Sequence, residues 1–573
     1  MISKKLTKLS KIEEDKIEYN KDTDYKLFRK IVLLKSFECI YKKQKTLFYY
    51  EDFYIKDSDI KNCKNDTKIK NNENELKKIK LSKSDFTQLL IDLFYNFIVD
   101  FAQNTRIGKP SVKYLNFRKL KIFIIVFIVL AVGCFFCKTL SCIFGSAIIT
   151  YFSFCCIVKN IILFYCFFTG KISVKNKQVK VKPEDVKTLP RYTILVPMFK
   201  ENEITIINLI ASLYKLKYPR HLLDVKFVLE ADDEKMRQML TNDVILPEWI
   251  TPIWVPYFEP RTKPKACNVA SLFADCNNDD IVVIFDAEDK PDENQLLMAV
   301  KGFEKNKNIA ILQGCLSFYN YNQNLLTQFF NIEYSVWFKI MLKCFDKLGI
   351  TIPLGGTSNH IKFSFLEKCN FWDSYNVTED LELSTNIGSE KIGHLDANTK
   401  EWCVVDLKAW FKQRTRWMKG YFLTYTVGFQ KERQTHTLSL HFLFIVGFFW
   451  LKKTIYHFFT SLCFRQVIVG YSTLMYLFLP FVSMFLWRNC YITIFIIWGI
   501  SNIIYYLSYI VIYFYLIRTK FVRFSKLTFL AFIAYPFYFI LHFIICWKAF
   551  FEVFTKPFYW SKTAHNANLH TDL

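Results

Sequence analysis

The first hundred residues contain no long apolar run, which a cleavable signal peptide would need near its start. The first such run begins at about residue 121, behind a leader of residues 1–118 that is rich in Lys, Asn, Asp and Glu. We therefore expect no cleavable signal peptide. The leader is expected to stay in the cytoplasm, and the sequence assigns it no role.

The sequence also lacks the cysteine framework of a small secreted protein. Its 17 cysteines are scattered over 573 residues, many of them beside Phe and Ile in apolar stretches. One pair, Cys134 and Cys137, has the spacing of a redox or zinc motif, but it lies inside an expected membrane helix. We therefore expect neither a disulfide framework nor a zinc site.

The soluble part of the chain lacks an excess of charge of one sign, whereas a nucleic-acid-binding surface would need basic and aromatic residues interleaved on one face of the domain. The net charge of +24 arises mainly in residues 1–120 and in loops beside apolar runs. That distribution agrees with the positive-inside rule and with attraction to anionic lipid headgroups. We therefore expect membrane lipids, and no nucleic acid, as partners.

Apolar residues make up 52% of the chain and gather in runs. A helix of about 20 apolar residues crosses a bilayer, and the candidate spans are residues 121–137, 145–168, 466–487, 491–516 and 527–547. The predicted segments are a leader in 1–118, two membrane helices in 119–169, a cytoplasmic domain in 171–430, an interfacial segment in 431–460, membrane helices in 461–551 and a tail in 552–573. The number of spans and the side of the C-terminus stay open.

The central part of the chain has the pattern of an α/β domain. Apolar β-rich runs recur between helical stretches at residues 192–196, 225–229, 281–285 and 309–312. This alternation predicts a parallel sheet with helices on its faces, and such sheets bind ligands beyond the carboxyl ends of their strands. Three of the runs lead into polar clusters, at residues 200–203, 230–233 and 286–289. We therefore expect a binding site at this edge of the sheet.

One of these clusters, together with a lysine pair upstream of it, suits a metal-bound diphosphate. Asp286 and Glu288 can jointly bind a hard divalent cation that bridges phosphate oxygens, although a solvated acidic turn is the alternative. Upstream, Lys263 and Lys265 precede a helix-like stretch, and lysines together with amides at a helix start bind phosphate. An exposed basic turn is the alternative there.

Two further elements follow in the second half of this domain. Asp380 lies at an expected helix start after Thr378 and Glu379, where an aspartate is more often a cap than a base. The string from Gln413 to Trp417, Gln-Arg-Thr-Arg-Trp, is the most specific element. Its alternative is an interfacial amphipathic helix whose Trp lies at the lipid headgroups.

In motif order, residues 190–430 resemble glycosyltransferase family 2, especially its membrane-embedded cellulose synthase-like branch. The resemblance implies an α/β GT-A domain, a Rossmann-like nucleotide-sugar-binding fold, flanked by transmembrane α-helices. The strings at 259–265, 375–380 and 556–565 are similar to those of a narrower bacterial group of membrane glycosyltransferases. An integral protein of the bacterial inner membrane with a cytoplasmic catalytic domain is therefore expected.

The resemblance assigns donor and metal positions. The implied donor-binding residues are Pro197, Glu201, Glu230, Asp232, Lys265, Asn268 and Asp286. The family's Asp-x-Asp metal motif corresponds to Asp286-Ala287-Glu288, for Mg²⁺ or Mn²⁺. Because Glu replaces the second Asp, either Glu288 or Asp289 completes the metal site.

The resemblance also assigns the reacting end of the acceptor. The family's general base corresponds to Asp380, and Glu379 positions the acceptor or the base. Gln413, Arg416 and Trp417 match the Gln-x-x-Arg-Trp motif of processive members. The resemblance implies that these residues contact the acceptor terminus and the diphosphate.

The implied function is inverting, metal-dependent transfer of a sugar from a nucleoside-diphosphate donor, expected to be a UDP-sugar, to a glycan acceptor. Processive polysaccharide synthesis is one form of it, and a single transfer to a lipid-phosphate acceptor is the other. A membrane transporter or scaffold is the alternative of another class. It would need charged residues along a path through the spans, and few are present away from span ends. No secretion partner is identified.

Overall fold

The computed structural model describes residues 25–26, 28–29, 36–41, 44–49, 77–105, 111–115, 117, 125, 129, 160, 164–165, 181–387, 390–435, 492–518 and 522–559. Its centre is an eight-stranded sheet with the order β6-β5-β4-β7-β10-β9-β11-β8. These strands are β4 (Tyr192–Met198), β5 (Leu223–Glu230), β6 (Ile250–Val255), β7 (Ile281–Ile284), β8 (Lys290–Pro291), β9 (Ile309–Phe318), β10 (Asn359–Lys362) and β11 (Lys391–Glu401).

The sheet is mixed, so the predicted α/β class is confirmed but the predicted parallel sheet is only half right. β4 pairs in parallel with β5 and β7, and β5 with β6, as the apolar runs indicate. β10 runs antiparallel to both β7 and β9. The sequence of β10, Asn-His-Ile-Lys, contains no apolar run, and hydrophobic pattern therefore could not identify it.

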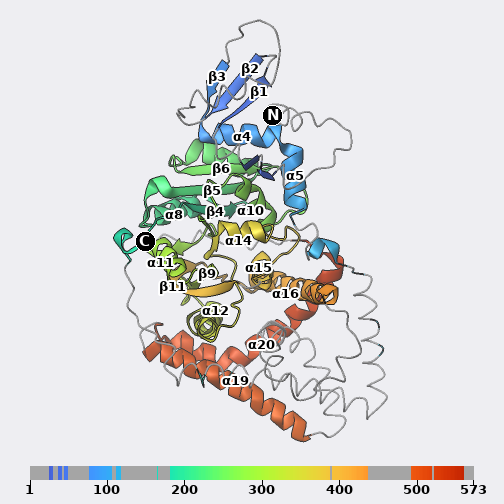
Figure 1. Ribbon diagram of the computed structural model, residues 1–573. Helices are drawn as coiled ribbons and strands as arrows, with labels where there is room; N and C mark the ends of the chain where they lie inside the picture. Colours follow the sequence, from blue (N-terminus) through green and yellow to red (C-terminus); the bar gives the residue numbers. More distant parts are fainter. Residues whose placement is uncertain are drawn as a thin grey trace, which may run out of the picture.

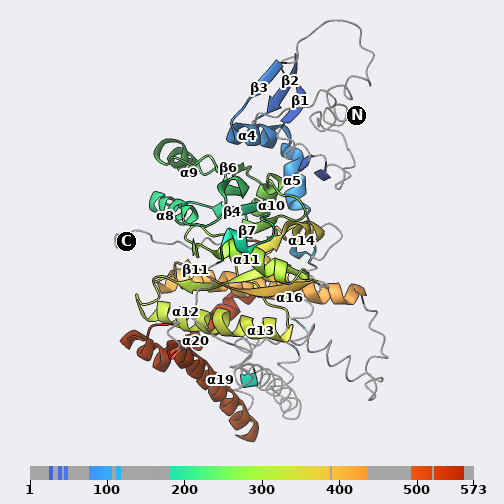
Figure 2. The same cartoon turned by 60° about the vertical axis from the view of Figure 1, so that its left-hand side comes forward.

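Helices cover both faces of the sheet (Figures 1 and 2). α10 (Lys263–Leu272) contacts β4, β5 and β6, whereas α11 (Gln295–Lys305) contacts β9 and β11. Alternate residues of one strand point to opposite faces. Accordingly, Leu195 packs in the same core as α10, whereas Val196 packs with α11 and with α8 (Glu203–Tyr214).

Part of the leader packs on the central domain. Helix α4 (Lys83–Leu93) contacts β6, and α5 (Tyr95–Gln103) contacts α10. Both helices bury apolar residues, including Leu90 and Phe101, in the core that contains α10. Strands β1 (Ser36–Tyr41), β2 (Gln44–Tyr49) and β3 (Lys77–Lys80) form a separate small sheet beyond α4 (Figure 1).

A layer of helices lies along the β9–β11 side of the domain (Figure 2). It comprises α12 (Leu325–Val336), α13 (Leu342–Leu348), α16 (Leu407–Thr435), α19 (Ile492–Arg518) and α20 (Lys526–Thr555). α20 packs against both α16 and α12, and α19 packs against α12. These contacts hold α16, which carries the Gln413–Trp417 string, against α20.

The predicted membrane spans are described only in part. Spans 491–516 and 527–547 coincide with α19 and α20. Among the helices of the described ranges, none combines the length and the apolar character that a bilayer crossing requires. The spans 121–137, 145–168 and 466–487 lie almost wholly outside the described residues, as do Cys134, Cys137 and most of the interfacial segment 431–460. The spans therefore stay predictions.

Candidate active site

The turn after β7 places three acidic residues at the carboxyl edge of the sheet. Asp286 and Glu288 are partly exposed, whereas Asp289 is 1% exposed. Asp289 Oδ2 accepts hydrogen bonds from the Asp286 amide (2.9 Å) and from the hydroxyl of Thr357. Burial, followed by the carboxylates of Asp286 and Glu288, raises the pKa of Asp289 well above its usual range. Asp289 thus shapes the turn that presents Asp286 and Glu288.

Lys263, at the start of α10, reaches this turn. Its Nζ lies 2.5 Å from Asp286 Oδ1 and 2.8 Å from the carbonyl oxygen of Gly356. Burial disfavours its charge, but Asp286 and then Glu379 outweigh that effect, and the pKa of Lys263 is raised. The resemblance selected Lys265, whereas the structure places Lys263 beside Asp286. The lysine pair as a whole was expected to bind phosphate, but no feature of the sequence tells which of the two lysines meets Asp286.

Lys265 is instead buried against the end of β5. Its Nζ lies 2.9 and 3.0 Å from the two carboxylate oxygens of Glu230, and it lies 4.7 Å from the centre of the Phe258 ring. The two side chains are 0% and 7% exposed. Burial lowers the pKa of Lys265 and raises that of Glu230. Two predicted donor residues therefore hold each other at the mouth of the sheet.

The other predicted donor residues divide between the edge and the interior. Asp232 is exposed and pairs with Arg261 (2.6 Å), whose guanidinium lies 4.5 Å from the centre of the Phe199 ring. Pro197, in β4, and Glu201, just beyond it, are both partly exposed at the same edge. A flat aromatic–guanidinium surface beside a carboxylate suits a nucleoside.

Asn268 is buried and has a bridging role. Its Nδ2 donates to the carbonyl oxygen of Trp372 (2.9 Å) and to Ser374 Oγ (2.8 Å), and its Oδ1 accepts from the Trp372 amide (3.1 Å). Thr262, the N-cap of α10, donates to the carbonyl oxygen of Ser374 (2.6 Å). These bonds tie the helix that carries Lys263 to the loop that leads into Asp380.

Asp380 occupies the first turn of α15 (Glu379–Thr385), and the N-cap residue is Thr378. Burial, and then the neighbouring Glu379 carboxylate, raises the pKa of Asp380 to about 7. Burial also raises the pKa of Glu379, against the opposing charge of Lys263. A carboxylate with a pKa near neutrality is suited to accept a proton in general base catalysis. The N-cap residue is thus Thr378 and not Asp380, and the base assignment stays a prediction.

Helix α16 meets the Asp380 loop closely. Arg416 donates to the carbonyl oxygen of Val377 (3.3 Å), and its charge acts on both Glu379 and Asp380. Gln413 and Trp417 are half-buried on the same helix. The predicted acceptor-end string thus lies beside the predicted base.

Trp417 is packed by its neighbours on α12 and α16. The guanidinium of Arg414 lies 4.4 Å from the Trp417 ring centre and 4.3 Å from that of Phe330. Arg414 donates to both oxygens of Glu333, at 2.8 and 2.7 Å. Burial alone would raise the pKa of Glu333, but the charge and the hydrogen bonds of Arg414 outweigh it, so this pKa is lowered. Arg414 and Glu333 therefore fix the orientation of the tryptophan.

Glu401, the last residue of β11, was not predicted. β11 pairs antiparallel with β8, with Thr399 opposite Pro291 and Lys400 opposite Lys290. Continuing this register by one residue places Glu401 opposite Asp289. Burial, and then Asp289 and Asp286, raises the pKa of Glu401 well above its usual range. A single Glu after an irregular polar strand carried no signal that hydrophobic pattern could detect.

The acidic residues of this edge fit a divalent cation. Carboxylate oxygens are the ligands that Mg²⁺ and Mn²⁺ prefer. Asp289 Oδ1 and Glu401 Oε1 are buried and have no hydrogen-bond partner among the described residues. Asp286, Glu288 and their neighbours therefore match the predicted metal site in chemical type.

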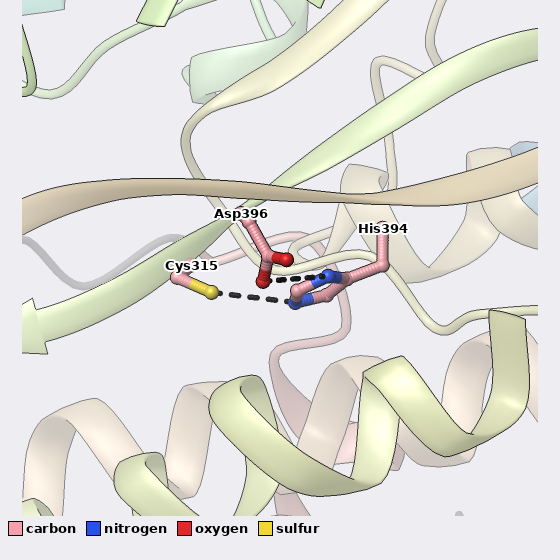
Figure 3. A group of neighbouring side chains, drawn as sticks. All are labelled: Cys315, His394 and Asp396. Carbon is pink, nitrogen blue, oxygen red and sulfur yellow. Dashed lines mark hydrogen bonds and ion pairs between the residues drawn. The ribbon is translucent and has the colours of Figure 1, made fainter. Parts of the chain in front are cut away.

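A second group of metal-type side chains lies on the other part of the sheet (Figure 3). His394 Nε2 donates to the carbonyl oxygen of Phe338 (2.9 Å) and lies 3.3 Å from Cys315 Sγ. Asp396 is paired through both oxygens with Lys343, each at 2.7 Å. Burial lowers the pKa of His394 and raises that of the Cys315 thiol to about 12. Protein groups already satisfy this cluster, and we assign no cation to it.

Comparisons with known proteins agree with the motif order. Residues 281–516 match the family model described as "Glycosyl transferase family group 2". A probable glycosyltransferase of Bacillus subtilis, YdaM, is 28% identical over 41% of this chain and 56% of its own length. Probable glucomannan 4-beta-mannosyltransferase 1 of Arabidopsis thaliana is 26% identical over 59% of this chain and 64% of its own length. The chain thus spans less than two thirds of both relatives.

Solved structures give a more distant likeness. A mannosyltransferase from Pyrobaculum calidifontis, in complex with GDP-Man and Mn²⁺, is 18% identical and covers 59% of this chain and 87% of its own, with a TM-score of 0.37. At this score the likeness supports no conclusion about the site.

Proposed function

We propose that the protein transfers a sugar from a nucleoside-diphosphate donor to an acceptor hydroxyl, because residues 281–516 match the family model described as "Glycosyl transferase family group 2". The observation that carries the proposal is the position of Lys263. Its ammonium contacts Asp286 and acts on Glu379 and Asp380, which joins a diphosphate-type site to a base. The reaction is expected to invert the configuration at the anomeric carbon.

Asp380 is the proposed base. The acceptor hydroxyl attacks the anomeric carbon, and Asp380 removes its proton as the new bond forms. Such proton transfer typically accelerates a reaction by about 10²–10⁴-fold. Arg416, which acts on Asp380 and Glu379, favours their ionised forms. Trp417 offers an aromatic face to the acceptor sugar.

The leaving diphosphate gains negative charge as the sugar bond breaks. Asp286 and Glu288 would hold a Mg²⁺ or Mn²⁺ ion, which neutralises charge on the diphosphate. Lys263, which contacts Asp286, would donate to a phosphate oxygen. The Arg261–Phe199 surface and Asp232 would receive the nucleoside.

The donor nucleotide distinguishes two forms of the proposal. The motif resemblance led us to expect a UDP-sugar, whereas relatives in Arabidopsis thaliana are named glucomannan 4-beta-mannosyltransferases. We therefore include GDP-mannose as the competing donor. A glycan polymer is the proposed product, since Gln413, Arg416 and Trp417 lie beside the base. A single transfer to a lipid-linked acceptor is the alternative.

The proposed location is the bacterial inner membrane, with the catalytic domain in the cytoplasm. Support comes from the large apolar side chains exposed on α19 and α20, among them Ile503 (58%) and Phe537 (68%). Exposed apolar surface of this kind marks contact with lipid or with a partner. Resistance of the protein to carbonate extraction tests the location, and a fully extractable protein would contradict it.

The activity is tested with purified full-length protein and radiolabelled UDP- and GDP-sugars, with and without Mn²⁺. We expect metal-stimulated transfer with one donor and retention of donor binding in Asp380→Asn. Product length separates a polymer from a single transfer. A membrane scaffold or transporter, the alternative of another class, predicts no transfer with any donor, and transfer by Asp380→Asn would remove the base assignment.

A further inference from the structure

We propose that Glu401 is an additional ligand of the divalent cation at the Asp286–Glu288 site. The inference rests on the proposed function, since it concerns the same metal-bound diphosphate. It is carried by the strand register, by two buried carboxylate oxygens without partners, and by the balance of charge around them.

The register brings Glu401 to the acidic turn from a distant part of the sequence. Asp289 and Lys290 lead into β8, which pairs antiparallel with the end of β11. Since Lys400 lies opposite Lys290, Glu401 lies opposite Asp289 at the mouth of the sheet. On its other side, β11 pairs with β9, where Glu401 is opposite Phe318. Two neighbouring strands thus fix its backbone.

Two carboxylate oxygens at this place lack protein partners. Asp289 is 1% exposed, and its Oδ2 is used by the Asp286 amide and by Thr357, but its Oδ1 has no partner among the described residues. Glu401 Oε1 is also buried without a described partner. Leaving a buried acceptor unsatisfied is costly, so such atoms point to a missing ligand.

The charges identify the class of that ligand. The carboxyl groups of Asp286, Glu288 and Asp289 act electrostatically on Glu401, and the positive charge of Lys263 opposes them. Lys263 contacts Asp286 Oδ1 and does not balance four carboxylates by itself. A buried excess of negative charge is relieved by a bound cation. Oxygen ligands from carboxylates select a hard divalent ion such as Mg²⁺ or Mn²⁺.

The ligand set then has two sources. Asp286 and Glu288 come from the β7–β8 turn, and Glu401 comes from the end of β11. Glu288 stands where the family's motif has its second Asp, which left open the residue that completes the metal site. Glu401 is our proposal for that residue. Asp289 holds the turn, while a carboxylate from another strand completes the site.

Mn²⁺ binding to full-length protein without nucleotide tests the inference, measured by electron paramagnetic resonance of free Mn²⁺. We expect Glu401→Gln to weaken Mn²⁺ binding by at least about tenfold, the smaller end of the range for groups that support metal sites. Glu293→Gln is the control, because Glu293 is an exposed partner of Lys217 and should leave binding unchanged.

Thermal unfolding separates loss of a ligand from loss of the fold. Without metal, Glu401→Gln removes repulsion and should melt no lower than the native protein, whereas the stabilisation by Mn²⁺ should shrink. Native affinity in Glu401→Gln, with loss in Asp286→Asn, would overturn the inference and leave the proposed function intact. If the native protein binds no Mn²⁺ with or without nucleotide, both the inference and the metal-dependent function fail.

Discussion

Gly420 of α16 lies so close to Thr378 that a Cβ atom at position 420 would fall 2.3 Å from Thr378 Oγ1. Thr378 immediately precedes Glu379 and Asp380, so this contact sets the distance between the Arg416 helix and the base. Gly420→Ala must therefore push α16 or the loop aside. Overpacking of this kind costs about 1–3 kcal/mol of stability.

We expect Gly420→Ala to lower kcat/KM by at least about tenfold, because displacements near 1 Å can cost on the order of 100-fold in rate. Donor binding should be largely kept, since the donor residues lie on other elements. Lys412→Ala, on the exposed side of α16, is the matched control. Native turnover in Gly420→Ala would show that the close approach is not needed for catalysis.

The pH dependence of transfer should follow Asp380. Its pKa is raised to about 7, and the base must be deprotonated to act, so kcat/KM should rise through about pH 7 and fall at lower pH. Measurement of kcat/KM of the native protein from about pH 5 to about pH 9 gives the pH at the midpoint of this rise. An activity that is constant from pH 6 to 8, roughly one unit on either side, would exclude this carboxyl as the base.

The same shift predicts a change in stability for Asp380→Asn. A carboxyl with a raised folded pKa contributes stability that is present below its unfolded value, 3.8, and is lost as the pH rises through about 7. Asn keeps the neutral form at every pH. We therefore expect Asp380→Asn to melt above the native protein at pH 8, about one unit above the folded pKa, with the difference closing in acid. Equal melting temperatures at high pH would contradict the raised pKa.

The sequence predicted those parts of the site that depend on strand ends. The apolar runs leading to Met198, Glu230 and Ile284 form neighbouring parallel strands of the sheet, so the acidic residues after them meet at one edge. Glu401 could not be found in this way. Its strand, β11, mixes apolar and polar residues and contains register shifts, and only the pairing with β8 brings it to Asp289.

The sequence also could not predict which of two nearby residues contacts a given partner. Lys263 and Lys265 lie on one helix start, but only the tertiary structure decides which meets Asp286 and which meets Glu230. Asn268 matched a donor motif, yet its amide is used by the loop at Trp372 and Ser374. Resemblance gives the residue type at a position, while the packing of α10 decides its partner.

The buried pair of Arg414 and Glu333 should hold Trp417 in place. Glu333→Gln leaves the Arg414 guanidinium without its anion, and losing hydrogen bonds to a charged group costs about 2 kcal/mol. We expect a lower denaturant midpoint and weaker binding of an oligosaccharide acceptor, with donor affinity unchanged. Lys343→Gln, which breaks the ion pair of α13 with Asp396 of β11 and leaves the Arg414–Glu333 pair in place, is the control. Unchanged acceptor binding in Glu333→Gln would contradict this positioning role.

Arg29 gives the leader a structural role that the sequence did not assign. Its guanidinium is buried and donates to the carbonyl oxygens of Leu272 (3.1 Å) and Cys276 (2.7 Å), at and beyond the end of α10. A cation at this end also complements the helix dipole. The other end of the same helix carries Lys263, so docking of the leader steadies the diphosphate lysine.

We expect Arg29→Met, which keeps most of the apolar stem, to destabilise the protein by about 3 kcal/mol through lost charge-assisted hydrogen bonds. Amide hydrogen exchange in α10 should be faster in this variant. The variant should also have a raised KM for the donor, with a smaller decrease in kcat. Lys26→Met, close in sequence and exposed, is the control. Unaltered exchange in α10 would show that the leader packs on the domain without supporting Lys263.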